Sequence, residues 1–187
     1  MDVMEAIKGR RSVRTFADTT VREADLEAVL EAARWAPSWA NTQCWRLIIV
    51  RNDGRKGELA ETLTPGNPAT EAVKKAPVVI VACAQLGLAG FKGGAPATDK
   101  GDWFMFDVAL AMHNLTLAAH ARGLGTVHVG LFDAKKAAQV MGLPKDASVV
   151  ELMPLGYPEV PPKLTTRVPL SEFVYYERYG SRGMRGR

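Results

Sequence analysis

The sequence has little cysteine and no apolar run long enough to cross a membrane. Its 187 residues contain only Cys44 and Cys83, which form no C-x-x-C pair, so we expect no disulfide framework and a reducing compartment. The longest apolar run, residues 77–84, is far shorter than the roughly 20 residues of a membrane helix. The first residues are acidic from position 2, unlike a secretory or transit peptide. These absences predict a soluble cytoplasmic protein with no membrane partner.

Several motifs of catalysis and nucleotide binding are also missing. There is no G-x-S-x-G, no G-x-x-x-x-G-K-[ST], and no base beside Cys44 in the sequence, which disfavours hydrolase, acyl-transfer and P-loop functions. His113 and His120 share one helix face but have no carboxylate or cysteine at a ligand spacing. We therefore expect no metal site and interpret both histidines as core residues.

The composition is that of a globular protein. Apolar residues make up 47% and charged residues 24% of a chain whose length suits one domain, 1–187, with a flexible basic tail from about 181 to 187. The net charge of +4 is small, and no aromatic residues are interleaved with the basic ones as stacking platforms. We expect no nucleic-acid partner.

Helical and strand patterns alternate along the chain without a linker. Capping boxes at Asp2/Glu5 and Thr20/Glu23 predict a helix ending near residue 9 and another that stops before Pro37. Strands are expected at 45–51, 78–84, 149–155 and, shorter, at 126–129, with a turn at 52–54 and a long loop at 85–102. The remaining helices are expected at 55–63, 70–75, 103–122 and 134–141. This interleaving favours a layered structure of helices and sheet.

Two polar segments are candidates for binding. In an extended chain, alternate residues share a face, so Arg10, Ser12 and Arg14 predict either a phosphate clamp or a solvated basic surface. The segment APSWANTQCW, residues 36–45, places Ser38, Asn41 and Gln43 between tryptophans. Their donors and acceptors suit the imide edge or ribityl hydroxyls of a flavin, but a polar turn with packed tryptophans explains them equally well.

Gly125 and Gly130 lie in GLGTVHVG, residues 123–130, which follows a helix and lacks the dinucleotide-binding spacing. These glycines either let the backbone approach a ligand closely or end a helix and pack a strand.

Four blocks in order resemble the nitroreductase family of flavoproteins. They are RRSVRTF, AARWAPSWANTQCW, DVALAMHNLTLAAHARGLGT, and the R-x-P-L-x-E-F-V of residues 167–174. The resemblance implies an α+β fold, the nitroreductase-like three-layer sandwich, with a mainly antiparallel central sheet flanked by helices. It also implies an intertwined homodimer with two FMN molecules at the interface and the helix 103–122 in the dimer core.

The same resemblance assigns the cofactor's phosphate and ribityl chain to one set of residues. These are Arg10, Arg11, Ser12 and Arg14, joined by Arg167. The family's second basic residue near Arg167 is replaced here by Thr165.

Two further segments are implied to contact the flavin. Pro37, Ser38, Trp39 and Asn41 would reach it from the partner subunit, and Gln43 would support that loop or touch the cofactor. Cys44 stands where the family usually has proline, and its role is open.

The isoalloxazine ring would rest on Val127, His128, Val129 and Gly130, with the N–H groups of the last two directed at its N5 and O4 edge. Such donors would stabilise the charge that appears on reduction, so no single catalytic side chain is predicted.

The implied function is an FMN-dependent oxidoreductase in which NADH or NADPH and then an electron-poor acceptor, such as a nitroaromatic or a quinone, react in a ping-pong sequence. The alternatives are another reduction on the same fold, such as reductive dehalogenation or flavin reduction, and a non-catalytic flavin-binding module.

Overall fold

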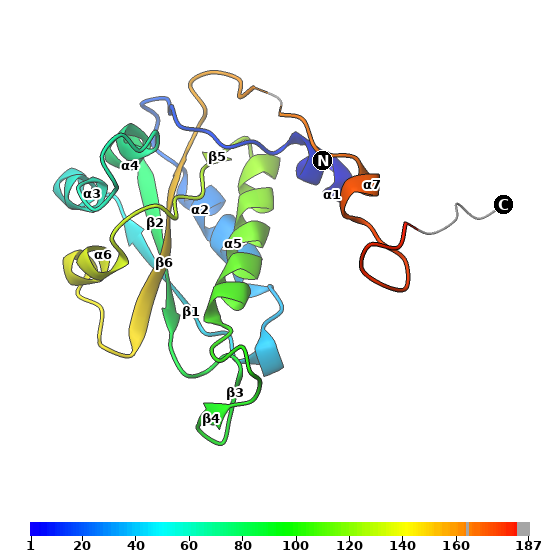
Figure 1. Cartoon of the computed structure of the whole chain (residues 1–187). Helices are drawn as coiled ribbons and strands as arrows, with labels where there is room; N and C mark the ends of the chain where they lie inside the picture. The colour runs from blue at the N-terminus through cyan, green and yellow to red at the C-terminus, as the bar shows by residue number, and fades with distance from the viewer. Residues whose placement is uncertain (164, 183–187) are drawn as a thin grey trace.

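A four-stranded antiparallel sheet forms the middle layer of the molecule (Figure 1). The computed structural model describes residues 1–163 and 165–182, so most of the tail predicted at 181–187 lies outside the described residues. The strands are ordered β1-β2-β6-β5, and every neighbouring pair is antiparallel. Their bounds are β1 Trp45–Val50, β2 Val78–Gln85, β5 Gly125–Thr126 and β6 Ala147–Gly156.

Helices cover both faces of this sheet. On one face lie α2 (Glu23–Arg34) and α5 (Phe104–Ala121), and on the other lie α3 (Asp53–Ala60), α4 (Thr70–Lys75) and α6 (Ala134–Met141) (Figure 1). The smaller elements are α1 (Val3–Gly9), η1 (Trp39–Asn41), the hairpin of β3 (Phe91–Lys92) and β4 (Ala95–Pro96), and α7 (Leu170–Phe173). The predicted three-layer α+β architecture is confirmed.

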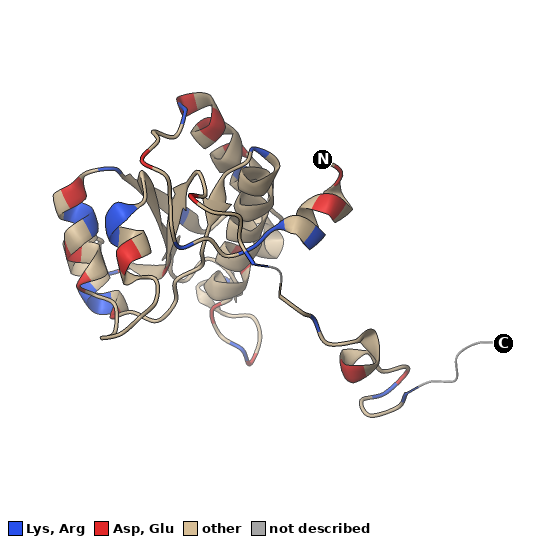
Figure 2. Ribbon diagram, turned by 90° about the horizontal axis from the view of Figure 1, so that it is seen from above, with Lys and Arg blue, Asp and Glu red and all other residues tan. Residues whose placement is uncertain are grey.

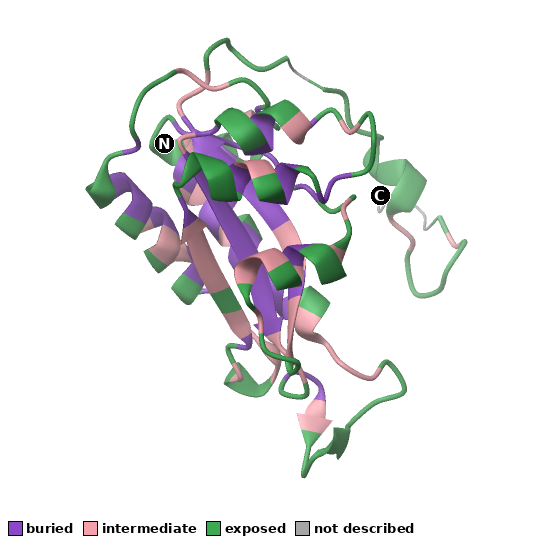
Figure 3. Ribbon diagram, turned by 90° about the vertical axis from the view of Figure 1, so that its left-hand side faces the viewer, coloured by how far each residue is buried: buried purple, intermediate pink, exposed green. Residues whose placement is uncertain are grey.

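The sheet divides the core in two, and β2 supplies both halves. Figure 3 shows that the middle of the sheet is buried. Ile80, Ala82 and Ala84 are buried against α2 and α5, whereas Val79 and Val81 are buried against the opposite helices. Successive side chains of a strand point to opposite faces, so a strand covered on both sides is apolar throughout. This explains the continuous apolar run of residues 77–84.

Helix caps account for several of the predicted boundaries. Asp2 and Glu5 form the capping box of α1, and Asp133 caps α6, which ends at Gly142 with a left-handed φ of 67°. The predicted box at Thr20 is wrong, because α2 begins after Arg22 without a side-chain cap and Arg22 pairs with Asp25 instead. The turn predicted at 52–54 belongs to the start of α3, which Asn52 caps.

One face of α5 is left uncovered in the described chain. Met105 and Phe106 are 56% and 55% exposed. His113 is also exposed and His120 half-buried, so the interpretation of both as core residues is wrong. Partial burial is the main cause that lowers the pKa of each imidazole. The next cause is the charge of His128 for His113 and the charge of Arg10 for His120.

Within 1–163 and 165–182, no three histidine, cysteine, aspartate or glutamate residues are grouped to hold a metal ion. No helix of that part is long and apolar enough to span a membrane.

Candidate functional site

The segment after α1 is held in an extended conformation beside the short strand β5. The N–H of Val13 donates to the carbonyl oxygen of Thr126 across 2.9 Å, and Ser12 forms a parallel bridge with the same residue. Val13 is buried while Ser12 and Arg14 are exposed, as the alternation of an extended chain requires. A Cβ on Gly125 would lie 2.6–2.9 Å from the side chain of Val13. The close approach made by Gly125 is therefore to the protein's own N-terminal segment.

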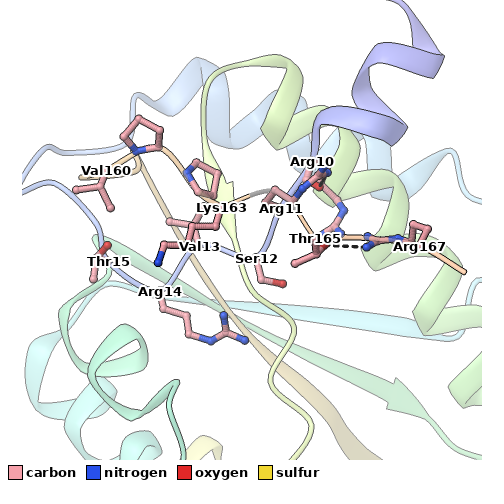
Figure 4. A pocket seen from close by; sticks show the side chains of 12 residues that line it. Arg10, Arg11, Ser12, Val13, Arg14, Thr15, Val160, Lys163, Thr165 and Arg167 are labelled. Atoms are coloured by element: carbon pink, nitrogen blue, oxygen red, sulfur yellow. Dashed lines mark hydrogen bonds between the residues drawn. The ribbon is translucent and has the colours of Figure 1, made fainter.

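This segment forms one wall of a basic cavity of about 500 Å³ (Figure 4). The opposite wall comes from the chain after β6, namely residues 160–163 with Thr165 and Arg167. The cationic residues that line it are Arg10, Arg11, Arg14, Lys163 and Arg167, and no acidic residue is among the lining residues. Partial burial lowers the pKa of Arg10, and the charges of Arg167 and Arg11 lower it further. The cavity thus concentrates positive charge in a partly dehydrated place, which favours an anion.

Two of the predicted phosphate ligands are partly engaged by the protein itself. The Nη1 of Arg11 donates to the carbonyl oxygens of Lys8 and Arg10, each at 2.6 Å, and so secures the end of α1. The Nη1 of Arg167 donates to the Thr165 hydroxyl at 2.7 Å (Figure 4). Thr165 therefore orients the arginine, although it cannot supply the charge of the basic residue expected there.

A second cavity of about 220 Å³ begins at Arg14, which lines both cavities. Its other walls are residues 67–69 and 127–131. Asn67 joins these walls, since its Nδ2 donates to the Leu131 carbonyl at 3.0 Å and its Oδ1 accepts the Ala69 N–H at 2.9 Å. Asn67 thus lines this cavity, a place that the sequence alone did not assign to it, because its partners are fixed only by the fold.

The prediction that the Val129 N–H faces a cofactor is wrong. Val129 and Leu152 exchange two backbone hydrogen bonds of 3.0 Å across an isolated bridge, so this N–H belongs to the sheet. Consecutive N–H groups of an extended chain point in opposite directions, which leaves the N–H of Gly130 directed away from the sheet. The ring of His128 is held by Glu151 at 2.8 Å and Thr116 at 3.2 Å.

The loop between α2 and β1 is more constrained than a polar turn. Three of its non-glycine residues, Ala40, Asn41 and Gln43, have left-handed φ angles of 46°, 57° and 49°. The Gln43 N–H donates to the Ser38 hydroxyl oxygen at 3.0 Å, and its side-chain Nε2 donates to Asn41 Oδ1 at 3.0 Å. The Trp39 N–H donates to the buried carboxylate of Asp107. Strained backbone of this kind clusters at ligand-binding sites.

Cys44 lies at the end of this loop, directly before β1. Its side chain is fully buried, and Sγ lies 3.8 Å from Asp107 Oδ2, close enough for a weak S–H hydrogen bond. Burial, together with the neighbouring charge of Asp107, raises the pKa of the thiol to about 11. The thiol is therefore protonated near neutral pH, and its S–H is a weak donor to Asp107 within the core. Cys83 is likewise buried, as predicted.

The two predicted halves of the site lie at opposite ends of α5. Trp39 binds Asp107 in the first turns of this helix, while Gly9 contacts His120 in its last turn. An 18-residue helix is about 27 Å long. In Figure 1, accordingly, the dark-blue segment 10–16 runs near one end of α5 and the light-blue segment around residue 40 near the other. The chain does not bring Arg10–Arg14 and Pro37–Gln43 together within one subunit.

The fold is an antiparallel α+β sandwich, and its basic cavity, which shares Arg14 with the second cavity, has the charge that suits an anionic ligand. A family model described as "Nitroreductase family" matches residues 7–157, which is most of the chain. The chain belongs to the nitroreductase family, as its four blocks predicted.

Relatives and solved structures agree with this assignment. The chain is 30% identical to an NADH dehydrogenase of Thermus thermophilus, over 94% of this chain and 96% of that protein. It is 26% identical to an FMN reductase [NAD(P)H] of Bacillus subtilis, over 95% and 74% of the two chains. Its fold matches the crystal structure of a nitroreductase family protein from Clostridium novyi NT with a TM-score of 0.77 and 30% identity, covering 97% and 96% of the chains.

Proposed function

We propose that this protein is an FMN-dependent oxidoreductase that uses NADH or NADPH to reduce electron-poor acceptors such as nitroaromatics or quinones by a ping-pong sequence. The observation that carries the proposal is the pair of cavities that meet at Arg14. The first, of about 500 Å³, is lined by five cations and suits a phosphate, and the second, of about 220 Å³, is lined by residues 67–69 and 127–131. A relative named FMN reductase [NAD(P)H] supports the choice of cofactor and donor.

The phosphate would be held by charge-assisted hydrogen bonds in the basic cavity. Arg10, Arg14 and Arg167 offer guanidinium forks, which match phosphate oxygens, and Ser12 offers a hydroxyl between them. Partial burial is the main cause that lowers the pKa of Arg10, and repulsion from the charges of Arg167 and Arg11 lowers it further. Neutralising that repulsion favours a bound phosphate.

The ring would lie in the second cavity. When bound, FMN supplies the chemistry of accepting hydride from a nicotinamide and passing reducing equivalents to an acceptor. The outward N–H of Gly130 would then stabilise negative charge at the ring edge, and the open space at its Cα leaves room for that approach. Asn67 links the two walls of this cavity through its side-chain hydrogen bonds.

We propose a homodimer because the loop 36–45 is too far from the basic cavity to complete it within one chain. The surface also has the apolar area that a partner would cover. Exposed large apolar residues occur on α5, on α1 and on α7, which projects from the body of the molecule (Figure 2): Met105, Phe106, Met4, Ile7, Leu170 and Phe173. Large exposed apolar patches mark interaction sites, and a second copy would bring its own loop to the cavity.

The test is to purify the protein, measure its flavin content and association state, and follow anaerobic reduction of the bound flavin by each nicotinamide. The reduced protein is then offered nitroaromatics, quinones, free FMN and halogenated aromatics. Rapid flavin reduction and reoxidation by nitroaromatics or quinones would support the proposal. A protein that binds no FMN, or binds it without reacting with either nicotinamide, would contradict it.

A further inference from the structure

The carboxylate of Asp107 is the point where the loop 36–45 is attached to the core. Asp107 is fully buried in the first turn of α5. The N–H of Trp39 donates to both of its oxygens, at 3.0 and 3.1 Å. The hydroxyl of Thr42 and the thiol of Cys44 approach Oδ2 at 3.4 and 3.8 Å. Three donors from one short loop therefore converge on a single carboxylate 63 to 68 residues away in the sequence.

From this convergence we propose that Asp107 is a positioning residue, which holds the loop in the conformation that presents Ser38 and Asn41 to the cofactor of the partner subunit. The inference rests on the proposed function for the identity of that cofactor. The attachment itself depends only on contacts within this chain.

A buried carboxylate needs compensation, and here the loop provides it. Among residues 1–163 and 165–182, no lysine, arginine or histidine forms an ion pair with Asp107. The positive end of the α5 dipole favours the charge at this position, and the loop donors satisfy its oxygens. The contact is reciprocal, because separating the loop from Asp107 would leave an uncompensated charge in the core. The buried carboxylate therefore strongly favours the conformation in which the loop is attached to it.

The loop requires such an anchor because its backbone is strained. Ala40, Asn41 and Gln43 all have left-handed φ angles, which residues with a Cβ adopt at a cost. The hydrogen bonds from Gln43 to Ser38 and Asn41 tie the loop to itself but not to the helix. The Asp107 carboxylate attaches the loop to the helix, since it accepts hydrogen bonds from Trp39 and Thr42.

This geometry determines what the loop offers outward. The oxygens of Ser38 and Asn41 already accept hydrogen bonds from Gln43, so the Ser38 O–H and the Asn41 amide N–H remain as donors. Asn41 and Gln43 are exposed. Loss of the anchor is expected to disorganise these donors while leaving the basic cavity, at the other end of α5, unchanged.

The experiment compares the full-length protein with Asp107→Asn and the matched control Asp25→Asn. Asp25 is equally buried and accepts three hydrogen bonds, but its donors are Arg22, Arg122 and Tyr157, which do not belong to the loop. Amide hydrogen exchange of residues 38–44 is measured without FMN, and FMN affinity is then measured by quenching of flavin fluorescence. The thermal midpoint records the general stability of each variant.

We expect Asp107→Asn to speed exchange of 38–44 and to weaken FMN binding, each by about tenfold, the change that corresponds to losing one charge-assisted hydrogen bond. Asp25→Asn should lower the thermal midpoint and change neither quantity. Wild-type exchange of 38–44 in Asp107→Asn would overturn the anchoring, and wild-type FMN affinity would overturn its role in binding. Wild-type protein without FMN affinity would instead overturn the proposed function, while the exchange result would still decide the anchoring.

A second pair of variants keeps the carboxylate and covers the case in which Asp107→Asn does not fold. Thr42→Val removes one donor, and Thr42→Ser retains it. Faster exchange of 38–44 and weaker FMN binding in Thr42→Val, restored in Thr42→Ser, are the expected results. Equal behaviour of the two variants would count against the anchor.

Discussion

The backbone N–H of Val13 donates to the carbonyl oxygen of Thr126 across 2.9 Å and fastens the arginine-rich segment to the edge of the sheet. The residues on either side of Val13, Ser12 and Arg14, consequently face outward. Arg14 is thereby placed where it lines both the basic cavity and the second cavity. This single attachment connects the two parts of the proposed cofactor site that lie within one chain.

Replacing Arg14 with alanine should weaken FMN binding more than it affects folding. A hydrogen bond to a charged group contributes about 1.5–3 kcal/mol, so the dissociation constant should rise about tenfold to a hundredfold. Arg55→Ala is the matched control, because Arg55 is an exposed arginine on α3 outside both cavities. Fluorescence titration with FMN measures both. An Arg14→Ala protein that retains wild-type affinity would remove Arg14 from the site.

Gly125→Ala should displace the arginine-rich segment from the sheet. The new Cβ would lie 2.6–2.9 Å from the branched side chain of Val13, which cannot swing aside. We expect a loss of about 1–3 kcal/mol in the free energy of unfolding, the usual cost of overpacking, together with weaker FMN binding. Gly57→Ala, where the Cβ meets nothing within 4 Å in α3, should stabilise by about 0.5–1 kcal/mol. Urea denaturation gives the free energy of unfolding of both variants. Equal values would contradict the predicted clash between the new Cβ at position 125 and Val13.

The native protein should lose stability in acid partly through Asp25. The hydrogen bonds from Arg22 and then Arg122 lower the pKa of this buried carboxyl to about 2, from an ordinary 3.8. A pKa lowered by folding stabilises the native state above the unfolded-state value, and this contribution is lost as the pH falls from about 4 towards 2. Asp25→Asn should therefore be less stable near neutral pH and show a shallower acid dependence. Denaturation curves across this range test it, and parallel pH profiles would refute it.

Neither cysteine should react in the folded protein. Burial raises the pKa of both thiols to about 11, and Asp107 contributes at Cys44, so the reactive thiolate is scarce at about pH 8. A chromogenic disulfide reagent should label no thiol in the native state and both after denaturation. Rapid labelling of native Cys44, with Cys44→Ala as the control, would show that the loop opens readily.

Local sequence patterns predicted most helices and strands well, because caps, turns and apolar periodicity depend on residues close together in the sequence. The bounds of α4 and α6 agree with the prediction, and at α6 the reason is the cap at Asp133 and the glycine at 142. Thr20 failed as a cap because its spacing to Glu23 does not reveal where the chain turns into α2. The resemblance predicted the family and the antiparallel sheet, which no local pattern distinguishes from a parallel one.

The site was predicted less completely, because its geometry depends on contacts between distant residues. The alternation of Arg10, Ser12 and Arg14 is visible in the sequence, and all three residues line the basic cavity. The sheet bond that uses the Val129 N–H, and the bonds of Asn67, require partners on other elements. Asp107 looks like an interruption of an apolar helix until the loop 68 residues earlier is folded onto it.

The central claim, that each cofactor site is built from two chains, is tested most directly by complementation in mixed dimers. One subunit carries Arg14→Ala, and the other carries Ser38→Ala with Asn41→Ala. If the basic cavity of one chain combines with the loop of its partner, each heterodimer contains one wild-type site and one doubly damaged site. Titration of purified heterodimers should then find tight FMN binding at half of the sites, and at almost none in either parent homodimer. Heterodimers without a tight site would contradict the claim.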